Sequence, residues 1–516
     1  IAKKDLDSEM TVVRNEMEDG ENSPFGVLSE RVYSTAYLWH NYGHDTIGAR
    51  SDVENVPIER LQAFYRTWYR PDNATLIVAG KIDPQKTLGT IQKYYGAIAR
   101  PTTTMPKFYT VEPVQDGERE VNVRRSGDVR VLNASYHIPG KTHPDIAALQ
   151  VLVTLLSDQA SGRLHKALVE TKIASGASAG YYGFRDSSLA SFVLSAPKDG
   201  DIAKAEAELL RIAEGFAASP LTDEEVNNAK QRIANNYERT FGDVDGVARG
   251  LTEAVAGGDW RLYFLHRDRI AAVTTADVNR VAKTYFKPSN RTLGRFIPTD
   301  GADRVQIAAA PTAAEALKGF AGKAAVAAGE TFDASHANIA SRTQTFVIGD
   351  TLKVSLLPKD TRGDAVLVGA TFRFGDVDSL RSVSKYTGTA AGALLMTGTT
   401  TMSREQIARK MDALKAVGGV GGDQQSASIS LQTKRETLAD TLALCADILR
   451  NANFPQNELD QYKLQMSTAL ESARKEPGTV AGLAMSRYFD PWPAGHPFSS
   501  VSLDEWIAGV RALDRD

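Results

Sequence analysis

The spacing of apolar residues divides the chain into segments with the period of a helix and segments with the period of a strand. The first helical stripe consists of Leu6, Met10, Val13 and Met17. A second helix is predicted over 58–69, a strand over 74–80, and a third helix after Asp83, whose carboxylate suits an N-cap. Residues 1–105 are therefore expected to form one unit of mixed helix and strand.

Residues 106–298 begin with strands and end with long helices. Two strands and two helices precede the apolar runs 175–184 and 189–197, which are predicted to be adjacent strands. Amphipathic helices cover roughly 201–286, and the run "RTLGRFIP" at 291–298 closes the region as a strand. This pattern predicts a second unit with a core of its own.

Residues 299–340 differ in composition from both of their neighbours, because they are rich in alanine and poor in large apolar side chains. Such a segment cannot build a core, so a linker is predicted. Residues 341–516 then restart the earlier pattern, with strands expected over 351–358 and 365–376 and a glycine-rich strand region at 417–433. The chain is thus expected to hold two halves.

A weak internal repeat supports this division. The sequence "GHDTIGARSDVENVPI" from Gly43 is echoed by "GHPFSSVSLDEWIAGVRAL" from Gly495, and in both a Gly-His turn leads through a loop to the start of a helix. The first copy continues into the strand predicted at 74–80, whereas the second stops at Asp516. A duplication with an incomplete second copy is expected.

Composition excludes several classes of function. With 60 basic and 63 acidic residues the net charge is −3, which gives no electrostatic footprint for nucleic acid. No apolar run approaches the length of a membrane span. The single cysteine, Cys445, excludes an internal disulfide framework and is expected to be a buried apolar residue. Because the chain starts at Ile1 without an initiator methionine or signal peptide, it is interpreted as a piece of a longer protein.

Two histidines raise the question of a metal site. His40 and His44, in "WHNYGHDTIG", have the spacing of the paired histidines in helical zinc motifs. The positions where such motifs carry glutamate hold Asn41 or Gly43, and both residues favour a turn over a helix. A loop with two partly exposed histidines is the preferred interpretation.

The first predicted helix offers a second candidate. Glu9 and Glu16 are seven residues apart, or about two turns, so both lie on one face. That face is about 60–80° from the apolar stripe, at the edge of the buried side, where a half-desolvated carboxylate can still reach a metal. An ordinary solvated face is the alternative, and spacing alone makes it the more common outcome.

Three ordered segments resemble the insulinase/pitrilysin family, which includes the mitochondrial processing peptidase. The family's Gly-x-x-x-Ile-Gly loop, its helix ending Tyr-Arg-Pro-x-Asn and its strand ending in Val-Ala-Gly match residues 43–48, 68–73 and 74–80. "SGRLHKALVETKIASGASAGYYG" from Ser161 resembles the second subdomain, and "LKVSLLPKDTRGDAVLVGATFRFGD" from Leu352 resembles the opening of the second half. The resemblance covers nearly the whole chain.

The resemblance implies an inverted zinc metallopeptidase. In this family HxxEH supplies two histidine ligands and a glutamate that activates the zinc-bound water, and a downstream helix adds a glutamate ligand. That helix resembles "SEMTVVRNEME", so the resemblance implies Glu16 as the third Zn²⁺ ligand and Glu9 as the residue that supports it. Zinc then polarises the peptide carbonyl while a carboxylate takes the proton of the water.

Pattern and resemblance together predict an α+β fold of repeated processing-peptidase-like subdomains, each a mainly antiparallel sheet with helices on one face. The resemblance assigns residues 1–105 to the remainder of the first subdomain and 106–298 to the second. It assigns 299–340 to the linker and 341–516 to a third, degenerate and truncated subdomain. Substrate is implied to add as a β-strand to a sheet edge in the first subdomain.

The sequence also departs from the family pattern. HxxEH should lie several dozen residues before Glu16, and this chain begins fifteen residues before it. In the second half, Thr389, Gly392 and Ala393 stand where the family motif has His, Glu and His, so that half is not expected to hold zinc. The Arg and Tyr that active members lend to the substrate from this half are expected beyond Asp516.

These observations predict a fragment of a zinc-dependent metalloendopeptidase that hydrolyses peptides or unfolded polypeptides and is inactive by itself. The alternative is a non-catalytic member of the family that binds peptides or scaffolds a partner. Expected partners are a peptide or unfolded protein substrate, with no nucleic acid and no membrane span, and a homo- or heterodimer stays open. A periplasmic or secreted location is favoured over the cytoplasm.

Overall fold

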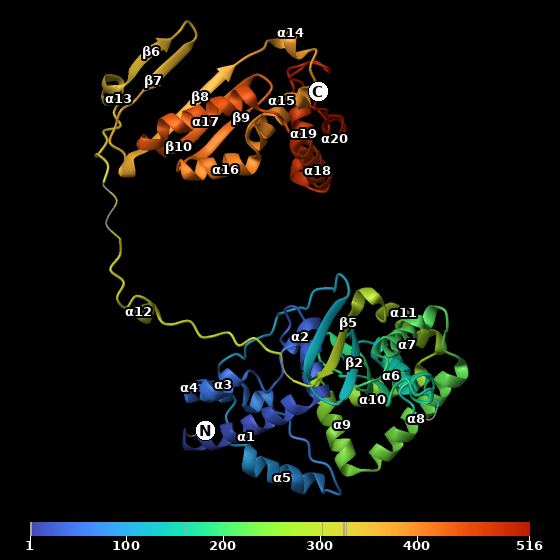
Figure 1. Cartoon of the computed structure of the whole chain (residues 1–516). Coiled ribbons are helices and arrows are strands. Elements are labelled where there is room, and N and C mark those ends of the chain that lie inside the picture. Colours follow the sequence, from blue (N-terminus) through green and yellow to red (C-terminus); the bar gives the residue numbers. More distant parts are fainter. Residues whose placement is uncertain (1–2, 160, 302, 324–325, 327, 516) are drawn as a thin grey trace. The chain divides into compact units, whose positions relative to one another are not determined.

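The fold is described from a computed structural model. The described residues are 3–159, 161–301, 303–323, 326 and 328–515. The chain divides into two compact units, Ile1–Ala309 and Ala310–Asp516 (Figure 1). Each unit has its own sheet and its own buried clusters, so each is described by itself.

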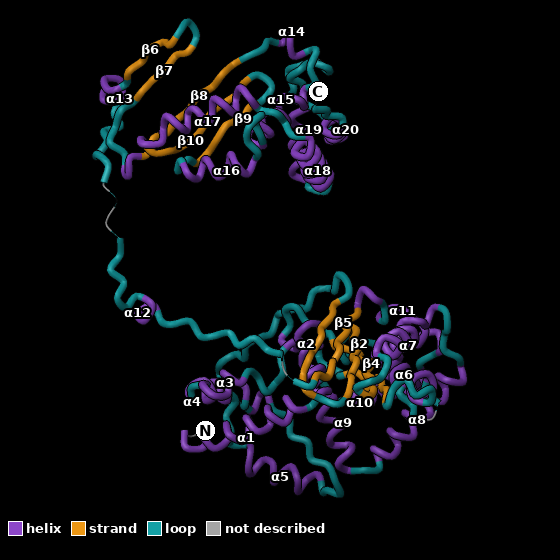
Figure 2. Tube along the Cα trace, viewed as in Figure 1, coloured by secondary structure: helices purple, strands orange, loops and turns teal. Residues whose placement is uncertain are grey.

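The first unit is organised around a five-stranded sheet, of which Figure 2 labels β5, β2 and β4. The strand order is β1-β5-β2-β4-β3. Its strands are β1 (Arg119–Ser126), β2 (Val129–Ile138), β3 (Gly176–Tyr181), β4 (Ser188–Pro197) and β5 (Arg291–Thr299). β2 runs antiparallel to β4 and β5, and β3 antiparallel to β4, whereas β1 and β5 run parallel. The strands predicted over 175–184, 189–197 and 291–298 are confirmed as β3, β4 and β5.

One face of this sheet carries the main core of the unit. Alternate residues of the strands, among them Leu132, Tyr136 and Phe192, point to this face and pack against helices. The helices that contribute to this core are α6 (Asp145–Leu156), α7 (Ile202–Glu214), α8 (Asp223–Phe241), α10 (Leu262–Ala272) and α11 (Thr275–Tyr285). Helix α9 (Val244–Ala256) packs against α8 and α10. Full burial of one such large side chain contributes roughly 1.5–3 kcal/mol, so this face supplies most of the apolar stabilisation of the unit.

Helix α2 (Pro24–Ala36) covers the opposite face of the same sheet. Its Leu28 and Val32 form a buried cluster with Phe296 and with the residues of β2 that alternate with those of the main core. The helix lies so close to β5 that a Cβ on Gly294 would overlap the Val32 side chain. We expected helices on one face of the sheet; α2 adds a cover on the other, which explains why β2 is buried along both faces.

The remaining helices of residues 1–105 are α1 (Lys3–Asn22), α3 (Arg50–Asn55), α4 (Ile58–Trp68) and α5 (Pro84–Tyr95). The helices predicted over 58–69 and after Asp83 are confirmed. The Asp83 carboxylate accepts hydrogen bonds from the backbone N–H groups of Gln85 and Lys86, at 2.9 and 3.1 Å, which makes it the N-cap of α5.

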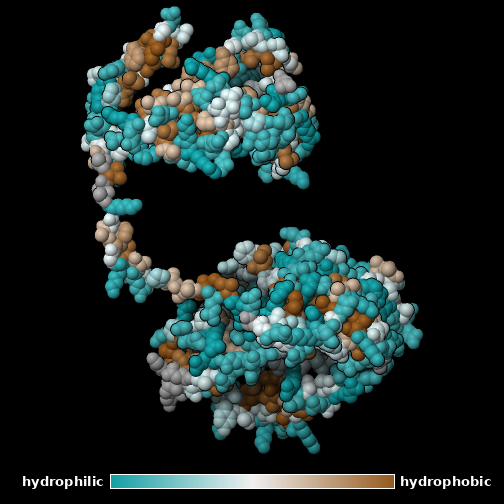
Figure 3. All heavy atoms as spheres, viewed as in Figure 1, coloured by the Kyte–Doolittle hydropathy of each residue, from teal (hydrophilic) through white to brown (hydrophobic). Residues whose placement is uncertain are grey.

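The strand predicted over 74–80 is not formed. This segment has no regular secondary structure, and it leaves Leu76 and Val78 exposed to 55% and 44%. The flanking helices α4 and α5 contain no buried residue, and apolar side chains of this kind are visible on the surface of both units (Figure 3). A strand needs a neighbour for its N–H and C=O groups, and none of the described strands pairs with this segment.

The second unit contains a three-stranded antiparallel sheet in the order β8-β10-β9 and a separate hairpin of β6 and β7. Its strands are β6 (Gln344–Ile348), β7 (Leu352–Leu356), β8 (Ala365–Arg373), β9 (Val417–Gly422) and β10 (Ser426–Lys434). Its helices are α12 (Ala313–Ala316), α13 (His336–Arg342), α14 (Val377–Leu380), α15 (Lys385–Leu394), α16 (Arg404–Ala413), α17 (Leu438–Asn451), α18 (Gln456–Ala473), α19 (Pro477–Tyr488) and α20 (Leu503–Arg511).

The α+β class predicted from the sequence is confirmed, because antiparallel-rich sheets pack against helices in both units. Cys445 lies fully buried on α17 in an apolar cluster, as its sequence context predicted. Among the described helices, none has both the length and the apolar character needed to cross a bilayer.

Candidate functional site

Helix α1 carries both candidate site residues, Glu9 and Glu16. Leu6 and Met10 of its apolar stripe line a cavity of about 530 Å³ together with residues 53–59, which run from α3 through a short loop to the start of α4. We expected the two carboxylates at the edge of this buried side, half-desolvated. Instead both residues are exposed, because the part of the chain around α1 covers the apolar stripe and little beyond it.

The acidic residues of α1 differ in their partners. Glu18 lies 3.4 Å from the Arg50 guanidinium and Glu21 lies 3.8 Å from that of Arg125, so the C-terminal end of the helix is tied to neighbouring elements. Glu9 and Glu16 have no hydrogen bond or ion pair with any described side chain. The helix therefore presents two carboxylates, two turns apart, that remain available to a ligand.

The histidine pair lies in a loop, as predicted. His40 precedes a single 3₁₀ turn, Asn41–Gly43, and His44 follows it, so the two rings do not share a helix face. His40 Nδ1 accepts a hydrogen bond from the Tyr42 N–H at 3.2 Å, which leaves the ring proton on Nε2, 3.6 Å from Asp186 Oδ2. His44 is exposed, whereas the His40 side chain keeps 11% of its surface accessible.

Glu112, which the sequence analysis did not single out, anchors this histidine loop. Its carboxylate accepts hydrogen bonds from three consecutive backbone N–H groups, Leu38, Trp39 and His40, at 2.7, 3.0 and 3.0 Å. Burial opposes ionisation of Glu112, but the three N–H donors outweigh it and hold the pKa of the carboxyl below its usual value. An isolated acid about seventy residues from its partners leaves no spacing signal in the sequence.

The C-terminal end of α2 is held by two side chains from the sheet. Arg119 donates to the carbonyl oxygens of Thr35 and Ala36, and His137 Nε2 donates to that of Ala36 at 3.0 Å. Such donors satisfy carbonyls that the helix leaves without partners. Burial lowers the pKa of His137 and keeps the ring neutral, and its Nδ1 is buried without a partner among the described residues.

The stability of the first unit is expected to fall as the pH drops below about 6.5, the ordinary pKa of histidine. Because burial lowers the pKa of His137, and likewise that of His266, the unfolded chain binds more protons than the folded chain in this range. The free energy of unfolding therefore decreases with falling pH. Thermal unfolding measured against pH tests this, with His137→Gln expected to flatten the profile. Superimposable profiles of the two proteins would contradict the assignment.

The Tyr-Arg-Pro-x-Asn segment that carries the family resemblance forms a buried polar clamp. Arg70 is 7% exposed and donates to both carboxylate oxygens of Asp72, at 2.6 and 2.8 Å, and to the Thr103 carbonyl oxygen at 2.6 Å. Asn73 donates its side-chain amide to the carbonyl oxygen of Trp68, at the end of α4, at 2.9 Å. The segment thus ties the exit of α4 to residues about thirty positions later.

Arg70→Ala is expected to loosen the chain between α4 and β1. Removing the guanidinium leaves the Asp72 carboxylate and the Thr103 carbonyl without this donor, so the loop opens more often and exposes its backbone. Limited proteolysis should cleave between residues 68 and 103 several-fold faster in the variant. Arg100→Ala serves as the control because Arg100 is an exposed side chain 3.8 Å from the same carboxylate. Equal cleavage rates in both variants would contradict this role.

In the second unit, the positions that the resemblance equates with HxxEH lie on α15. Thr389 and Ala393 are exposed, whereas Gly392 is buried against β9. A Cβ on Gly392 would overlap the carbonyl group of Gly422, so this position leaves no room for a side chain. A hydroxyl, a hydrogen and a methyl group at the three positions provide neither imidazole nor carboxylate.

Comparison with known proteins gives consistent matches. Residues 55–233 match the family described as "Peptidase M16 inactive domain". The zinc protease PqqE of Helicobacter pylori is 26% identical over 275 residues, which are 53% of this chain and 62% of that protein. The probable mitochondrial-processing peptidase subunit beta of Arabidopsis thaliana is 23% identical over 153 residues, 29% of each chain. The crystal structure of a protease from Helicobacter pylori has a TM-score of 0.56 at 25% identity, and the match covers 58% of this chain and 73% of that one.

The matches cover only part of each relative and only part of this chain. The chain spans 62% of the bacterial relative and 29% of the plant one, so it corresponds to part of each. The family match over 55–233 begins after α1, and the helix that carries Glu9 and Glu16 lies outside it. The described residues contain no group of three or more His, Cys, Asp or Glu side chains placed to hold a metal ion.

Proposed function

Because this chain belongs to the M16 peptidase family, we propose that the full-length protein is a zinc-dependent metalloendopeptidase that cleaves peptides or unfolded polypeptides. In this proposal α1 contributes Glu16 as one zinc ligand and Glu9 as the residue that orients and tunes it. When bound, the zinc ion polarises the scissile carbonyl and lowers the pKa of its water.

The observation that carries this assignment is the difference between the described glutamates of α1. Glu18 and Glu21 are paired with arginines, whereas Glu9 and Glu16, like the shorter Asp19, stay exposed and without a partner among the described side chains. Carboxylates that bind a metal need free oxygen lone pairs and an open approach. Two such groups separated by two helical turns match the ligand and its support.

The described residues do not by themselves fit a zinc ion. A catalytic zinc site takes three protein ligands, and the described residues contain no group of three or more His, Cys, Asp or Glu side chains placed to hold a metal ion. The proposal therefore assigns the other two ligands to chain outside residues 1–516. The part played by this chain is to hold Glu16 on a helix that the apolar stripe fixes against α3.

A non-catalytic role in peptide binding or scaffolding is the second candidate. It is favoured by the description of the matched family, the inactive domain of M16 peptidases, over 55–233. Under this alternative the exposed acids of α1 are ordinary solvated charges. The location in the periplasm or outside the cell, a homo- or heterodimer, and the subdomain boundaries at 105, 298 and 340 remain predictions.

The zinc content of the full-length protein separates the two candidates. Purified wild type is expected to carry one zinc per active site by elemental mass spectrometry, and Glu16→Gln to lose it. Glu18→Gln is the matched control, since it lies on the same helix but pairs with Arg50. Unchanged stoichiometry in Glu16→Gln would remove Glu16 from the site, and a metal-free wild type would favour the non-catalytic role.

A further inference from the structure

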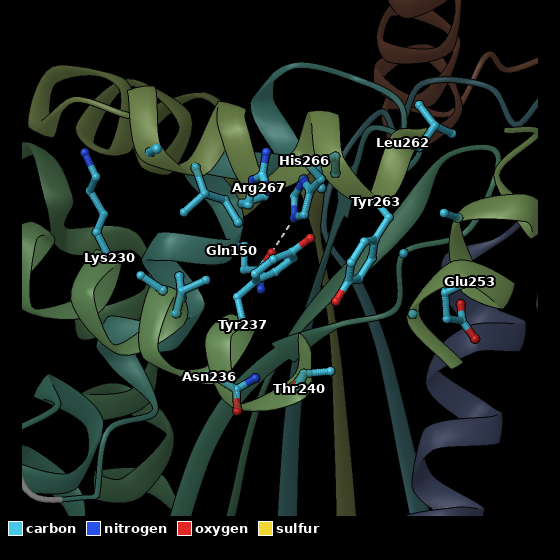
Figure 4. Close-up of a pocket in the computed structure, with 18 of the residues that line it drawn as sticks. Gln150, Lys230, Asn236, Tyr237, Thr240, Glu253, Leu262, Tyr263, His266 and Arg267 are labelled. Atoms are coloured by element: carbon cyan, nitrogen blue, oxygen red, sulfur yellow. Dashed lines mark hydrogen bonds between the residues drawn. The ribbon is translucent and has the colours of Figure 1, made fainter. Parts of the chain in front are cut away.

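A cavity of about 940 Å³ lies among the helices of the first unit, away from α1 and the histidine loop. It is bounded by α8, α9 and α10, with α6 and β3 closing it from the side of the sheet (Figure 4). Pockets that hold small molecules in proteins have volumes of about 300–1,000 Å³. The volume of this cavity lies at the upper end of that range. It is larger than the packing defects found in a close-packed protein core.

The walls of the cavity are apolar and aromatic. Tyr237 of α8 and Tyr263 of α10 stack with their ring centroids 5.0 Å apart, and together they form one wall (Figure 4). Ile146, Ile233 and Leu262 supply aliphatic surface. A planar apolar group placed here gains contact with two rings and with branched side chains.

One pair of polar side chains in the cavity lining can orient a ligand. The His266 ring donates from Nε2 to the Gln150 side-chain carbonyl, the contact drawn in Figure 4. Burial lowers the pKa of His266, so the ring is neutral and its Nδ1 is an acceptor. The Gln150 amide keeps two N–H donors. Within the described part of the chain neither group is bonded further, so the cavity presents a donor and an acceptor side by side.

The charged side chains around the cavity already have hydrogen-bond or ion-pair partners. Lys141 and Lys230 each donate to a backbone carbonyl oxygen, at 2.7 and 2.6 Å, and Arg267 pairs with Asp268 at 2.7 Å. The carboxylate of Glu253 lies 3.6 Å from Lys141. A charged ligand would lose its hydration without gaining a free counter-ion, which disfavours its binding.

From these features we infer that the cavity binds an uncharged aromatic group that carries an amide. The ring lies against Tyr237 and Tyr263, and the amide pairs its carbonyl with the Gln150 N–H and its N–H with His266 Nδ1. This chemistry occurs both in free aromatic amides and in an internal aromatic residue of a polypeptide. The polypeptide case rests on the proposed peptidase function, and the free ligand does not.

Two matched probes test the inference. N-acetyl-L-tryptophanamide is uncharged and N-acetyl-L-tryptophan differs from it by one carboxylate. Saturation-transfer NMR and crystal soaking with the whole chain should show the amide in the cavity, and the acid should bind at least about tenfold more weakly. Equal affinity for the two probes, or no binding of the amide at about 10 mM, would overturn the inference.

Three variants locate the binding. Ala234→Phe places a ring in the cavity from α8, whereas Asn235→Phe on the same helix points outside the lining and is the control. Ala234→Phe is expected to abolish binding and Asn235→Phe to leave it unchanged. Gln150→Leu is expected to weaken binding of N-acetyl-L-tryptophanamide about five- to tenfold, which corresponds to the loss of one or two neutral hydrogen bonds. Thermal unfolding of each variant shows that it is folded, and binding retained by folded Ala234→Phe contradicts the site.

A third measurement distinguishes the two sources. If the natural occupant is a polypeptide, a capped pentapeptide with a central tryptophan displaces N-acetyl-L-tryptophanamide and binds at least as tightly. If the occupant is a free small molecule, the pentapeptide fails to compete, which excludes the polypeptide source. These ligand-binding measurements do not depend on zinc. If Glu16→Gln keeps its metal, the result for the cavity is unaffected, and if the cavity binds neither probe, the zinc test of Glu16 is unaffected.

Discussion

Glu16→Gln in the full-length protein is expected to reduce peptide hydrolysis at least about a thousandfold. In the proposed site, a zinc ion held by Glu16 would stabilise the charge of the transition state by several kcal/mol, and each 1.36 kcal/mol corresponds to about a factor of ten in rate. A neutral amide oxygen is a weaker zinc ligand than a carboxylate, so both metal content and turnover fall. Steady-state hydrolysis of a quenched fluorescent peptide measures this loss, with zinc added to the assay in a second series.

Two neighbours on α1 make this expectation specific. Glu9→Gln should lower the rate about ten- to a hundredfold with a smaller loss of metal, as is usual for groups that support a ligand. Glu18→Gln should leave the rate within about twofold, because this residue faces Arg50. If Glu16→Gln and Glu18→Gln hydrolyse the peptide equally fast, Glu16 is not a ligand.

Gly392→Glu is expected to unfold the region around α15 and β9 and to lower the free energy of unfolding by about 3 kcal/mol or more. The substitution introduces a glutamate at the position that the resemblance equates with the glutamate of HxxEH. It also places a Cβ where the carbonyl group of Gly422 already lies and buries a carboxylate that has no described cation beside it. Hydrogen exchange of the α15 and β9 amides, followed by mass spectrometry, should show loss of protection.

Ala393→Glu is the matched control on the same helix. Its side chain is exposed, so the free energy of unfolding should change by no more than about 0.5 kcal/mol. Similar protection of β9 in both variants would mean that α15 can move away from the sheet and would contradict the close approach at Gly392. The stability of Gly392→Glu thus tests whether the close approach of Gly392 to Gly422 excludes a side chain at this position.

Long periodic segments were predictable from the sequence, and short or unsupported ones were not. The strands of 175–197 and the helices of 201–286 form as predicted, because each buries its apolar face within the same unit. The segment 74–80 has an equally clear strand pattern yet stays irregular, since strand formation depends on a neighbour that periodicity cannot reveal. For the same reason the packing of α2 on the second face of the sheet was not anticipated.

The candidate site divides in a similar way. The turn at His40 followed from Asn41 and Gly43, whose local preferences act within a few residues. The exposure of Glu9 and Glu16 could not be predicted in this way. A helical wheel gives the angle between these residues and the apolar stripe, but it does not show whether another element covers that face of the helix. Glu112 and its three backbone donors depend on the tertiary fold and left no local pattern to detect.

The place of β5 in the sheet also constrains when the first unit can be completed. β5 lies between β1 and β2 and pairs with both, although Thr292 comes 173 residues after its partner Arg119. A ribosome therefore synthesises β1 to β4 and all the described helices of this unit before β5 exists. Until then β1 has no place in the sheet, and its edge and that of β2 are open to wrong pairing. The last strand to be made is the one that closes the core, so truncation before residue 291 should leave a collapsed chain without a cooperative fold.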